Sequence, residues 1–91
     1  MVYEVKFTET FQKKALKFLK SHPDAFDRYK KTLILLGDNP FHPSLRLHKL
    51  QGKHEAYYSV SITMSYRMII EFLVVDKEII PLSIGTHDEV Y

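Results

Sequence analysis

Residues 66–85 have the sequence YRMIIEFLVVDKEIIPLSIG, in which two long apolar runs flank the polar pair Asp76-Lys77. Apolar runs rich in Ile, Val and Phe on either side of a short polar segment are typical of a β-hairpin. The sequence therefore predicts strands over residues 66–75 and 78–85, joined by a tight turn. Pro81 has no N–H group to offer a neighbouring strand, so it predicts either an unpaired edge or a bulge in the second strand.

Two further strands are predicted by the alternation of polar and apolar side chains. Residues 57–64 alternate in this way just before the hairpin, and residues 2–8 do so near the beginning of the sequence. A period of two places successive side chains on opposite faces of a strand, which is the pattern of a half-buried sheet.

Two helices are predicted between these strands. The first runs from a cap at Thr8 or Thr10 to about residue 21, with apolar side chains at helical spacing at Phe11, Ala15, Phe18 and Leu19. The second begins at Pro23-Asp24 and ends at Gly37, with an apolar stripe of Phe26, Tyr29, Leu33 and Leu36. The predicted fold is a single α+β domain over residues 1–91 with the order β-α-α-β-β-β, in which a helical hairpin packs on a twisted, mainly antiparallel four-stranded sheet.

The composition excludes several classes of protein. The 91 residues include no cysteine, which rules out a disulfide scaffold, a thiolate nucleophile and any cysteine-ligated metal. The sequence has no uncharged stretch as long as a membrane span and no signal peptide, so a cytoplasmic protein is expected. The net charge of +2 is unevenly distributed, because residues 1–55 carry eleven Lys and Arg and six Asp and Glu, whereas residues 56–91 carry two and five.

The basic charge is concentrated between residues 42 and 54. This stretch has no Asp or Glu, and its basic and imidazole side chains are His42, Arg46, His48, Lys49, Lys53 and His54. Nucleic acid is the natural polyanion for such a surface, and a solvated loop is the alternative. The three histidines lack the helical spacing and the neighbouring carboxylates of a zinc site, so neither a metal nor another cofactor is predicted.

The hairpin is expected to bring a second pair of basic residues together. If a two-residue loop joins its strands, Arg67 faces Thr86 and lies next to His87. A guanidinium beside an imidazole suits the binding and transformation of a phosphodiester. The alternative is that Arg67 pairs with Glu71, two residues further along the same face, and that His87 is simply exposed.

Three short motifs carry a resemblance to a known family: HKLQG at residues 48–52, YRMIIEF at residues 66–72 and IGTHDEVY at residues 84–91. In this order and spacing, with the predicted order of strands and helices, they resemble the RelE/YoeB/YafQ superfamily of toxin-antitoxin mRNA endonucleases, which includes the ParE-like toxins. The resemblance implies metal-free cleavage of mRNA, usually in the ribosomal A site, by attack of a ribose 2′-OH on the adjacent phosphate. It also implies a cognate antitoxin as partner, assembled with the toxin as a heterotetramer.

The resemblance further implies roles for single residues. Arg67 matches the family's arginine that holds the scissile phosphate, and His87 matches the histidine that acts as general acid for the leaving 5′-oxygen. Tyr91 matches the C-terminal tyrosine that contacts or deprotonates the reacting nucleotide, and His48 matches a histidine that serves as an acid, a base or a phosphate contact. The general base is thus open between His48 and Tyr91. The RNA-binding residues expected around these four are Arg46, Lys49, Lys53, His54 and Tyr57.

The sequence departs from the family at three positions. Ile62 and Tyr66 stand where the YafQ branch has His and Asp, and Ser44 stands near the position of the YoeB-type glutamate. Two other functions are therefore weighed beside the nuclease. One is a ParE-like toxin that inhibits DNA gyrase and needs no acid or base, and the other is a non-catalytic RNA-binding module of the same fold.

Overall fold

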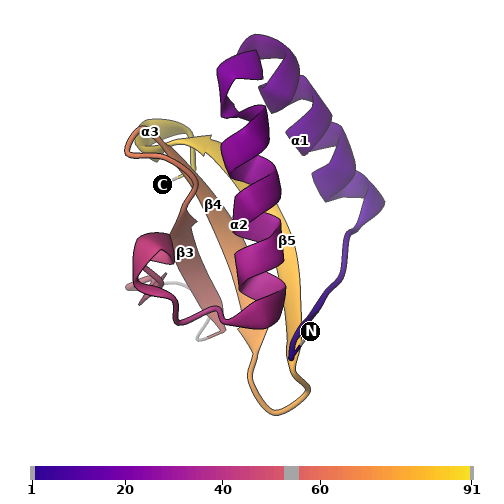
Figure 1. Ribbon diagram of the computed structural model, residues 1–91, viewed down its shortest axis with the longest axis vertical. Coiled ribbons are helices and arrows are strands. Elements are labelled where there is room, and N and C mark those ends of the chain that lie inside the picture. Colours follow the sequence, from indigo (N-terminus) through magenta and orange to yellow (C-terminus); the bar gives the residue numbers. More distant parts are fainter. Residues whose placement is uncertain (1, 53–55, 91) are drawn as a thin grey trace.

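The computed structural model describes residues 2–52 and 56–90 (Figure 1). A short strand, β1 (Glu4–Val5), precedes two long helices, α1 (Glu9–Ser21) and α2 (Phe26–Asp38). The remaining elements are β2 (His48–Lys49), β3 (Tyr57–Ser61), β4 (Tyr66–Leu73), β5 (Glu78–Thr86) and the short helix α3 (His87–Val90). Two 3-10 turns, η1 (Pro23–Ala25) and η2 (Pro43–Leu45), precede α2 and β2.

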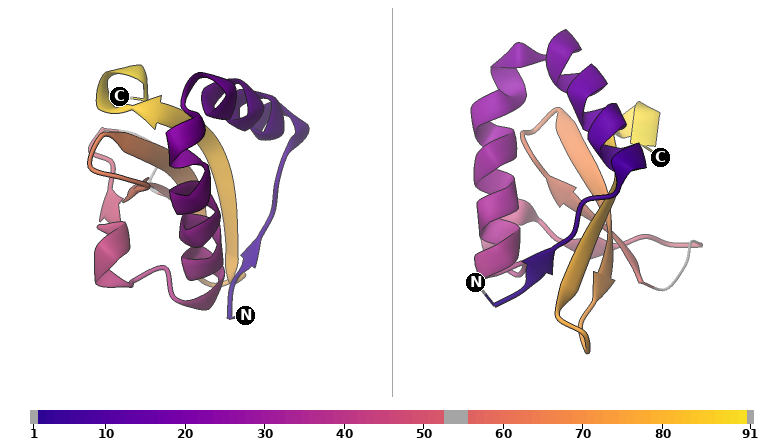
Figure 2. Two further views of the ribbon diagram at one scale, coloured as in Figure 1. Left: turned by 45° about the horizontal axis from the view of Figure 1, so that its top comes forward. Right: turned by 90° about the vertical axis from the view of Figure 1, so that its right-hand side faces the viewer.

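Five strands within the described residues form one mixed sheet in the order β1-β5-β4-β3-β2. Strand β1 is parallel to β5, and the other neighbours are antiparallel. Figures 1 and 2 show α2 across one face of the sheet, α1 beside the edge of β5, and α3 at the end of β5. The predicted α+β class and element order are confirmed. The sheet has one strand more than predicted, because part of the basic stretch pairs with β3 as β2.

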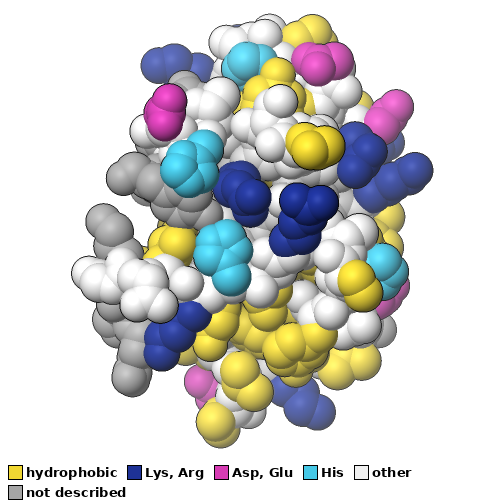
Figure 3. Space-filling model, turned by 90° about the vertical axis from the view of Figure 1, so that its left-hand side faces the viewer, with side chains coloured by type: hydrophobic (Ala, Val, Ile, Leu, Met, Phe, Trp, Pro, Cys, Tyr) yellow, Lys and Arg dark blue, Asp and Glu magenta, His cyan; other side chains and the backbone are white. Residues whose placement is uncertain are grey.

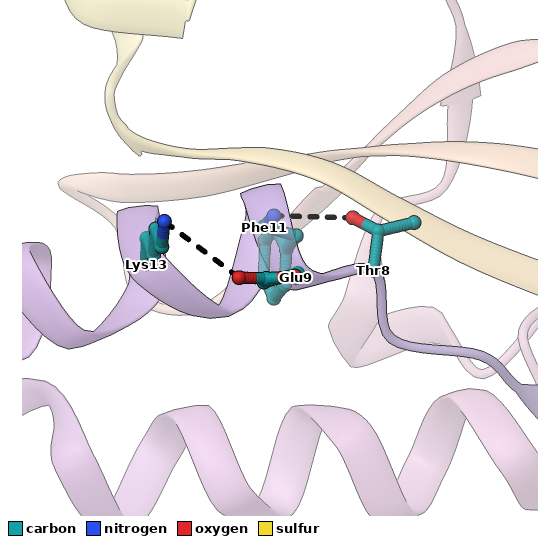
Figure 4. Close-up of polar contacts among 4 residues, drawn as sticks. All are labelled: Thr8, Glu9, Phe11 and Lys13. Atoms are coloured by element: carbon teal, nitrogen blue, oxygen red, sulfur yellow. Dashed lines mark hydrogen bonds and ion pairs between the residues drawn. The ribbon is translucent and has the colours of Figure 1, made fainter.

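Helix α1 begins where the sequence predicts. The Thr8 hydroxyl accepts a hydrogen bond from the backbone N–H of Phe11 at 3.1 Å (Figure 4), which satisfies one of the free donors of the first turn. Glu9 lies 3.7 Å from Lys13, one turn later, in the orientation that supports a helix. The buried residues of the helix are Phe11, Ala15 and Phe18.

Helix α2 differs from its prediction in two respects. Phe26 is 47% exposed and has the Lys30 ammonium 4.8 Å from its ring centre, so it does not belong to the core. Gly37 lies inside the helix, which ends one residue later. Its carbonyl accepts hydrogen bonds from the N–H groups of Val2 and Tyr3, both at 2.9 Å. Gly37 therefore accepts hydrogen bonds from the N-terminal segment and does not serve as a cap.

The core lies between the two long helices and one face of the sheet. Its buried side chains include Phe11, Ala15, Tyr29 and Leu36 from the helices and Val60, Met68, Ile70, Phe72 and Ile79 from the strands. Along β4 these core residues alternate with Arg67, Ile69 and Glu71, which consequently lie on the opposite face of the sheet.

Among the described helices, none has the length and the apolar composition that a membrane span requires.

The register of the β4–β5 hairpin differs from the prediction. The loop has four residues instead of two, since Leu73 pairs with Glu78. A bulge beside Pro81 then shifts the register by one residue, which is one of the two outcomes that this proline predicts. Arg67 consequently pairs with Gly85 and not with Thr86.

Strands β1 and β3 are shorter than predicted. Strand β3 ends at Ser61, and the backbone N–H groups of Ile62 and Thr63 donate hydrogen bonds to the carbonyl of Tyr66. Met64, predicted as the last strand residue, is 88% exposed in the turn before β4.

Candidate phosphodiester site on the sheet

The second face of the sheet, which α2 does not cover, carries both Arg67 and His48. Strand alternation and pairing place Ser59 and Ser61 of β3 on the same face as Arg67 and Ile69 of β4. His48 pairs with Ser59, and directly opposed residues of antiparallel strands share a face. Two residues that are nineteen positions apart in the sequence therefore point to the same side of the sheet.

Arg67 is positioned by strands on both sides of it, with Ser61 of β3 and Gly85 of β5 as its Cα partners. Its Nη1 atom is buried and has no hydrogen-bond partner within the described residues. Ser59 Oγ on the same face is likewise buried and unpaired. Arg67 forms no ion pair with Glu71, so the alternative of a local salt bridge is wrong. Buried polar groups normally find partners, so these two unsatisfied atoms are exceptions that the packing of the described residues does not explain.

His48 is oriented by the turn that precedes it. Its Nδ1 lies 3.2 Å from the backbone carbonyl oxygen of Arg46, an acceptor, so in this contact Nδ1 carries the proton. In the neutral imidazole the lone pair is then on Nε2, which is the tautomer needed for a base acting through that atom. Arg46 adopts a left-handed conformation, with φ 49° and ψ 48°, at the end of η2, and its carbonyl oxygen points toward His48 Nδ1 in this conformation.

Arg67 and His48 are separated by two strand spacings and by two residues along the strand. Ser59 stands between His48 and Ile69, and Arg67 is two residues from Ile69. With strands about 4.8 Å apart and a rise of about 3.4 Å per residue, the Cα atoms of Arg67 and His48 are about 12 Å apart. The two long side chains on one face can therefore contact the same phosphodiester group when it lies between them.

His87 lies at the same end of the sheet as Arg67. It is the first residue of α3 and follows Gly85, the β5 partner of Arg67, by two residues. Helix α3 packs against β5 and β4. The His87 side chain is 69% exposed, and its Nδ1 lies 3.8 Å from the carboxylate of Asp88, which is an ion pair when the imidazole is protonated.

The predicted RNA-binding residues are divided between the two faces. Tyr57 lies on the face of Arg67, whereas Tyr58 packs against the core beside Phe72. Lys49 pairs with Tyr58 and so is directed to the other face, away from Arg67. The predicted residues Lys53, His54 and Tyr91 lie outside the described residues. Within residues 2–52 and 56–90, no group of three or more His, Asp or Glu side chains could hold a metal ion.

A groove of about 410 Å³ adjoins this site, and the sequence does not reveal it. Its lining includes Thr10, Lys14, Leu50, Tyr57, Ile69 and Val90. The ammonium of Lys14 donates to the carbonyl of Leu82 at 3.2 Å, next to the β5 bulge. The lysine-rich side of α1 is most simply interpreted from sequence as solvated, and only the packing of α1 against β5 brings Lys14 to the groove.

Comparisons with known proteins support the fold described above. Neither a protein-family model nor a curated protein matches the chain. Among solved structures, a chain of the E. coli DinJ–YafQ toxin–antitoxin complex is 18% identical with a TM-score of 0.79, over 100% of this chain and 99% of that one. A YoeB/ParE toxin from Agrobacterium tumefaciens is 13% identical with a TM-score of 0.74, over 92% and 98%. A copper-bound mutant toxin from Helicobacter pylori is 25% identical with a TM-score of 0.68, over 98% and 99%.

The fold is that of the small toxins of toxin–antitoxin systems. Its structural neighbours in that class are the YafQ, YoeB/ParE-like and H. pylori toxins, and the fold implied by the sequence resemblance to the RelE/YoeB/YafQ superfamily is confirmed.

Proposed function

We propose that the protein is the toxin of a toxin–antitoxin system and an endoribonuclease that cleaves mRNA on the ribosome without a metal ion. The observation that carries this proposal is the buried, unpaired Nη1 of Arg67. A buried donor without a partner costs about 1–3 kcal/mol, so stability of the fold does not account for this arginine. A phosphate group of RNA would supply both the missing acceptor and the counter-charge.

The proposed reaction uses three side chains: one removes a proton, one donates a proton and one stabilises charge. His48 Nε2 accepts the proton of a ribose 2′-OH, and the resulting oxygen attacks the adjacent phosphorus. The bond between phosphorus and the 5′-oxygen breaks, and protonated His87 gives its proton to that oxygen. Arg67 stabilises the additional negative charge of the intermediate phosphorane. The products are a 2′,3′-cyclic phosphate and a 5′-hydroxyl end, and Tyr91 is the second candidate for the base.

An antitoxin partner is proposed from the shared fold and from charge. The YafQ structure of the same fold is a complex with DinJ, a toxin–antitoxin pair. In this chain Arg46 and His48 are exposed, and His48 lies on the same face of the sheet as Arg67. A partner segment with Asp or Glu side chains would complement this cationic surface and block access of RNA. We expect the antitoxin to cover Arg46, His48 and Arg67.

The test is the chemistry of the product ends. Purified protein is incubated in EDTA with a defined mRNA, either free or bound to programmed ribosomes, and the fragment termini are analysed by mass spectrometry. The proposal predicts cyclic phosphate and 5′-hydroxyl ends from ribosome-bound mRNA, and none once antitoxin is added. RNA binding without cleavage would instead indicate the non-catalytic module. Inhibition of gyrase supercoiling without RNA cleavage would indicate the ParE-like function.

A further inference from the structure

A second cationic feature lies along the edge of β3, separate from Arg67. Two adjoining cavities of about 190 and 370 Å³ lie between α2, η2 and the turn from β3 to β4. Arg28, Ser44, Ser61 and Ile62 line both cavities. The two cavities are termed here the β3-edge groove.

The lining of the β3-edge groove is positively charged. Its charged side chains are Arg28, Lys31 and Arg46, and the lining contains no Asp or Glu. Ser44, Ser61 and Thr63 add hydroxyl groups. Figure 3 shows Lys, Arg and His side chains gathered across the middle of one face of the molecule, with hydrophobic side chains below them.

The cations of the groove are not used in ion pairs within the described part of the chain. Asp24 and Asp27 precede Arg28 and Lys31 by four residues, the spacing at which helical ion pairs form. Neither pair is within salt-bridge distance, and Arg46 has no carboxylate partner among the described residues either. Three cations from two segments thus line one groove, while the acidic residues closest in sequence are left unpaired.

The groove is connected to the Arg67 site through two residues. Ser61, which lines both cavities, is the β3 partner of Arg67. Arg46 also lines the larger cavity, and its backbone carbonyl oxygen lies 3.2 Å from Nδ1 of His48. The groove is on the α2 side of β3 and Arg67 is on the other side, so a strand of RNA with one phosphate at Arg67 would reach the groove by passing round the end of β3 at Ser61.

We infer that the β3-edge groove binds a second phosphate of the RNA strand, beyond the scissile phosphate held by Arg67. This inference rests on the proposed function. The guanidinium groups and the ammonium group neutralise phosphate charge, and the hydroxyls donate to its oxygens. Leu35, Leu45 and Ile62, which also line the groove, provide apolar contact for a ribose. An acidic protein segment would satisfy the cations but has no ribose to place against the apolar side chains.

The test compares RNA binding by two double variants with the same loss of charge. Arg28→Gln/Lys31→Gln removes two cations of the groove, and the control Lys13→Gln/Lys20→Gln removes two exposed lysines of α1. Binding is measured by fluorescence anisotropy as a function of salt, with fully 2′-O-methylated RNA that has no 2′-OH for attack. One probe is an octanucleotide, and the other is a dinucleotide with a single phosphate.

For the octanucleotide, loss of the second phosphate contact should reduce the slope of log K against log salt by about 0.7 and weaken binding about 5-fold at 0.1 M salt. The dinucleotide should bind the groove variant and the wild type equally, because its phosphate occupies Arg67. The control variant should keep the wild-type slope, and thermal unfolding should show that all three proteins are folded.

The outcomes separate the two proposals. If the wild type cleaves no RNA but the groove variant still loses its affinity for the octanucleotide, the proposed nuclease activity is wrong and the inferred phosphate site in the groove is supported. If the wild type cleaves and the groove variant binds the octanucleotide with wild-type affinity and slope, the groove inference is overturned. It is also overturned if the groove variant keeps RNA binding and loses binding of an Asp- and Glu-rich peptide, because the groove is then a protein-binding surface.

Discussion

Replacing Arg67 with methionine is expected to make the protein more stable and inactive. Methionine replaces the aliphatic part of the side chain as far as about Nε and removes the buried Nη1 that no described residue satisfies. Removal of such a donor recovers about 1–3 kcal/mol of unfolding free energy. For a domain of this size, each kcal/mol raises Tm by about 4–8 °C. Loss of a single cation at the phosphorane should lower the single-turnover cleavage rate by about 10²–10³.

The assay combines urea unfolding with single-turnover cleavage of ribosome-bound mRNA. Lys20→Met is the matched control, since it removes an exposed cation and should change neither quantity. Arg67→Lys should recover part of the rate, because an ammonium supplies the charge without the bidentate geometry of a guanidinium. A decrease in stability of Arg67→Met would show that the guanidinium supports the fold. Retention of the cleavage rate would show that it does not contact the reacting phosphate.

Further predictions concern the acid, the base and the stability of the fold. His87→Gln should lower the cleavage rate by about 10²–10⁴ and remove the alkaline limb of a bell-shaped pH profile, because only a protonated imidazole can donate. His48→Gln should remove the acidic limb, and an intact limb in this variant with a strong defect in Tyr91→Phe would assign the base to Tyr91. Burial raises the pKa of Tyr29, so its contribution to stability is complete below the ordinary tyrosine value of about 10 and is lost as pH rises above it. Urea titrations at pH 8 and 11 should therefore show a smaller loss of stability in Tyr29→Phe than in the wild type. Thr8→Ala should destabilise the protein by about 1 kcal/mol in urea, and no change would mean that the hydroxyl does not cap α1.

Structural features that depend only on residues close together in the sequence could be predicted from it. The start of α1 follows from the Thr8 hydroxyl and the N–H of Phe11, three residues apart. The bulge in β5 follows from the missing N–H of Pro81. The end of α2 could not be predicted in this way. Gly37 is a common capping residue, and its use by the distant N–H groups of Val2 and Tyr3 depends on tertiary packing.

The arrangement of the candidate site was predictable only in part. Arg67 stands out as a charge in an apolar strand, and that signal is local. The strand β2 is too short to be recognised from sequence, and its pairing decides that His48 shares a face with Arg67 while Lys49 does not. Ser59 resembles any polar strand residue, and its unpaired hydroxyl becomes evident only when the sheet is complete.

The role of Arg67 at the cleaved phosphate is tested most directly by mapping mRNA 5′ ends on programmed ribosomes incubated with the wild type and with Arg67→Met. We expect new 5′ ends within the A-site codon for the wild type, and none for an Arg67→Met protein that is folded and at least as stable. Equal cleavage by the two proteins, or no cleavage by the wild type, would contradict the claim that the unpaired Arg67 on the second face of the sheet binds the phosphate at which RNA is cut.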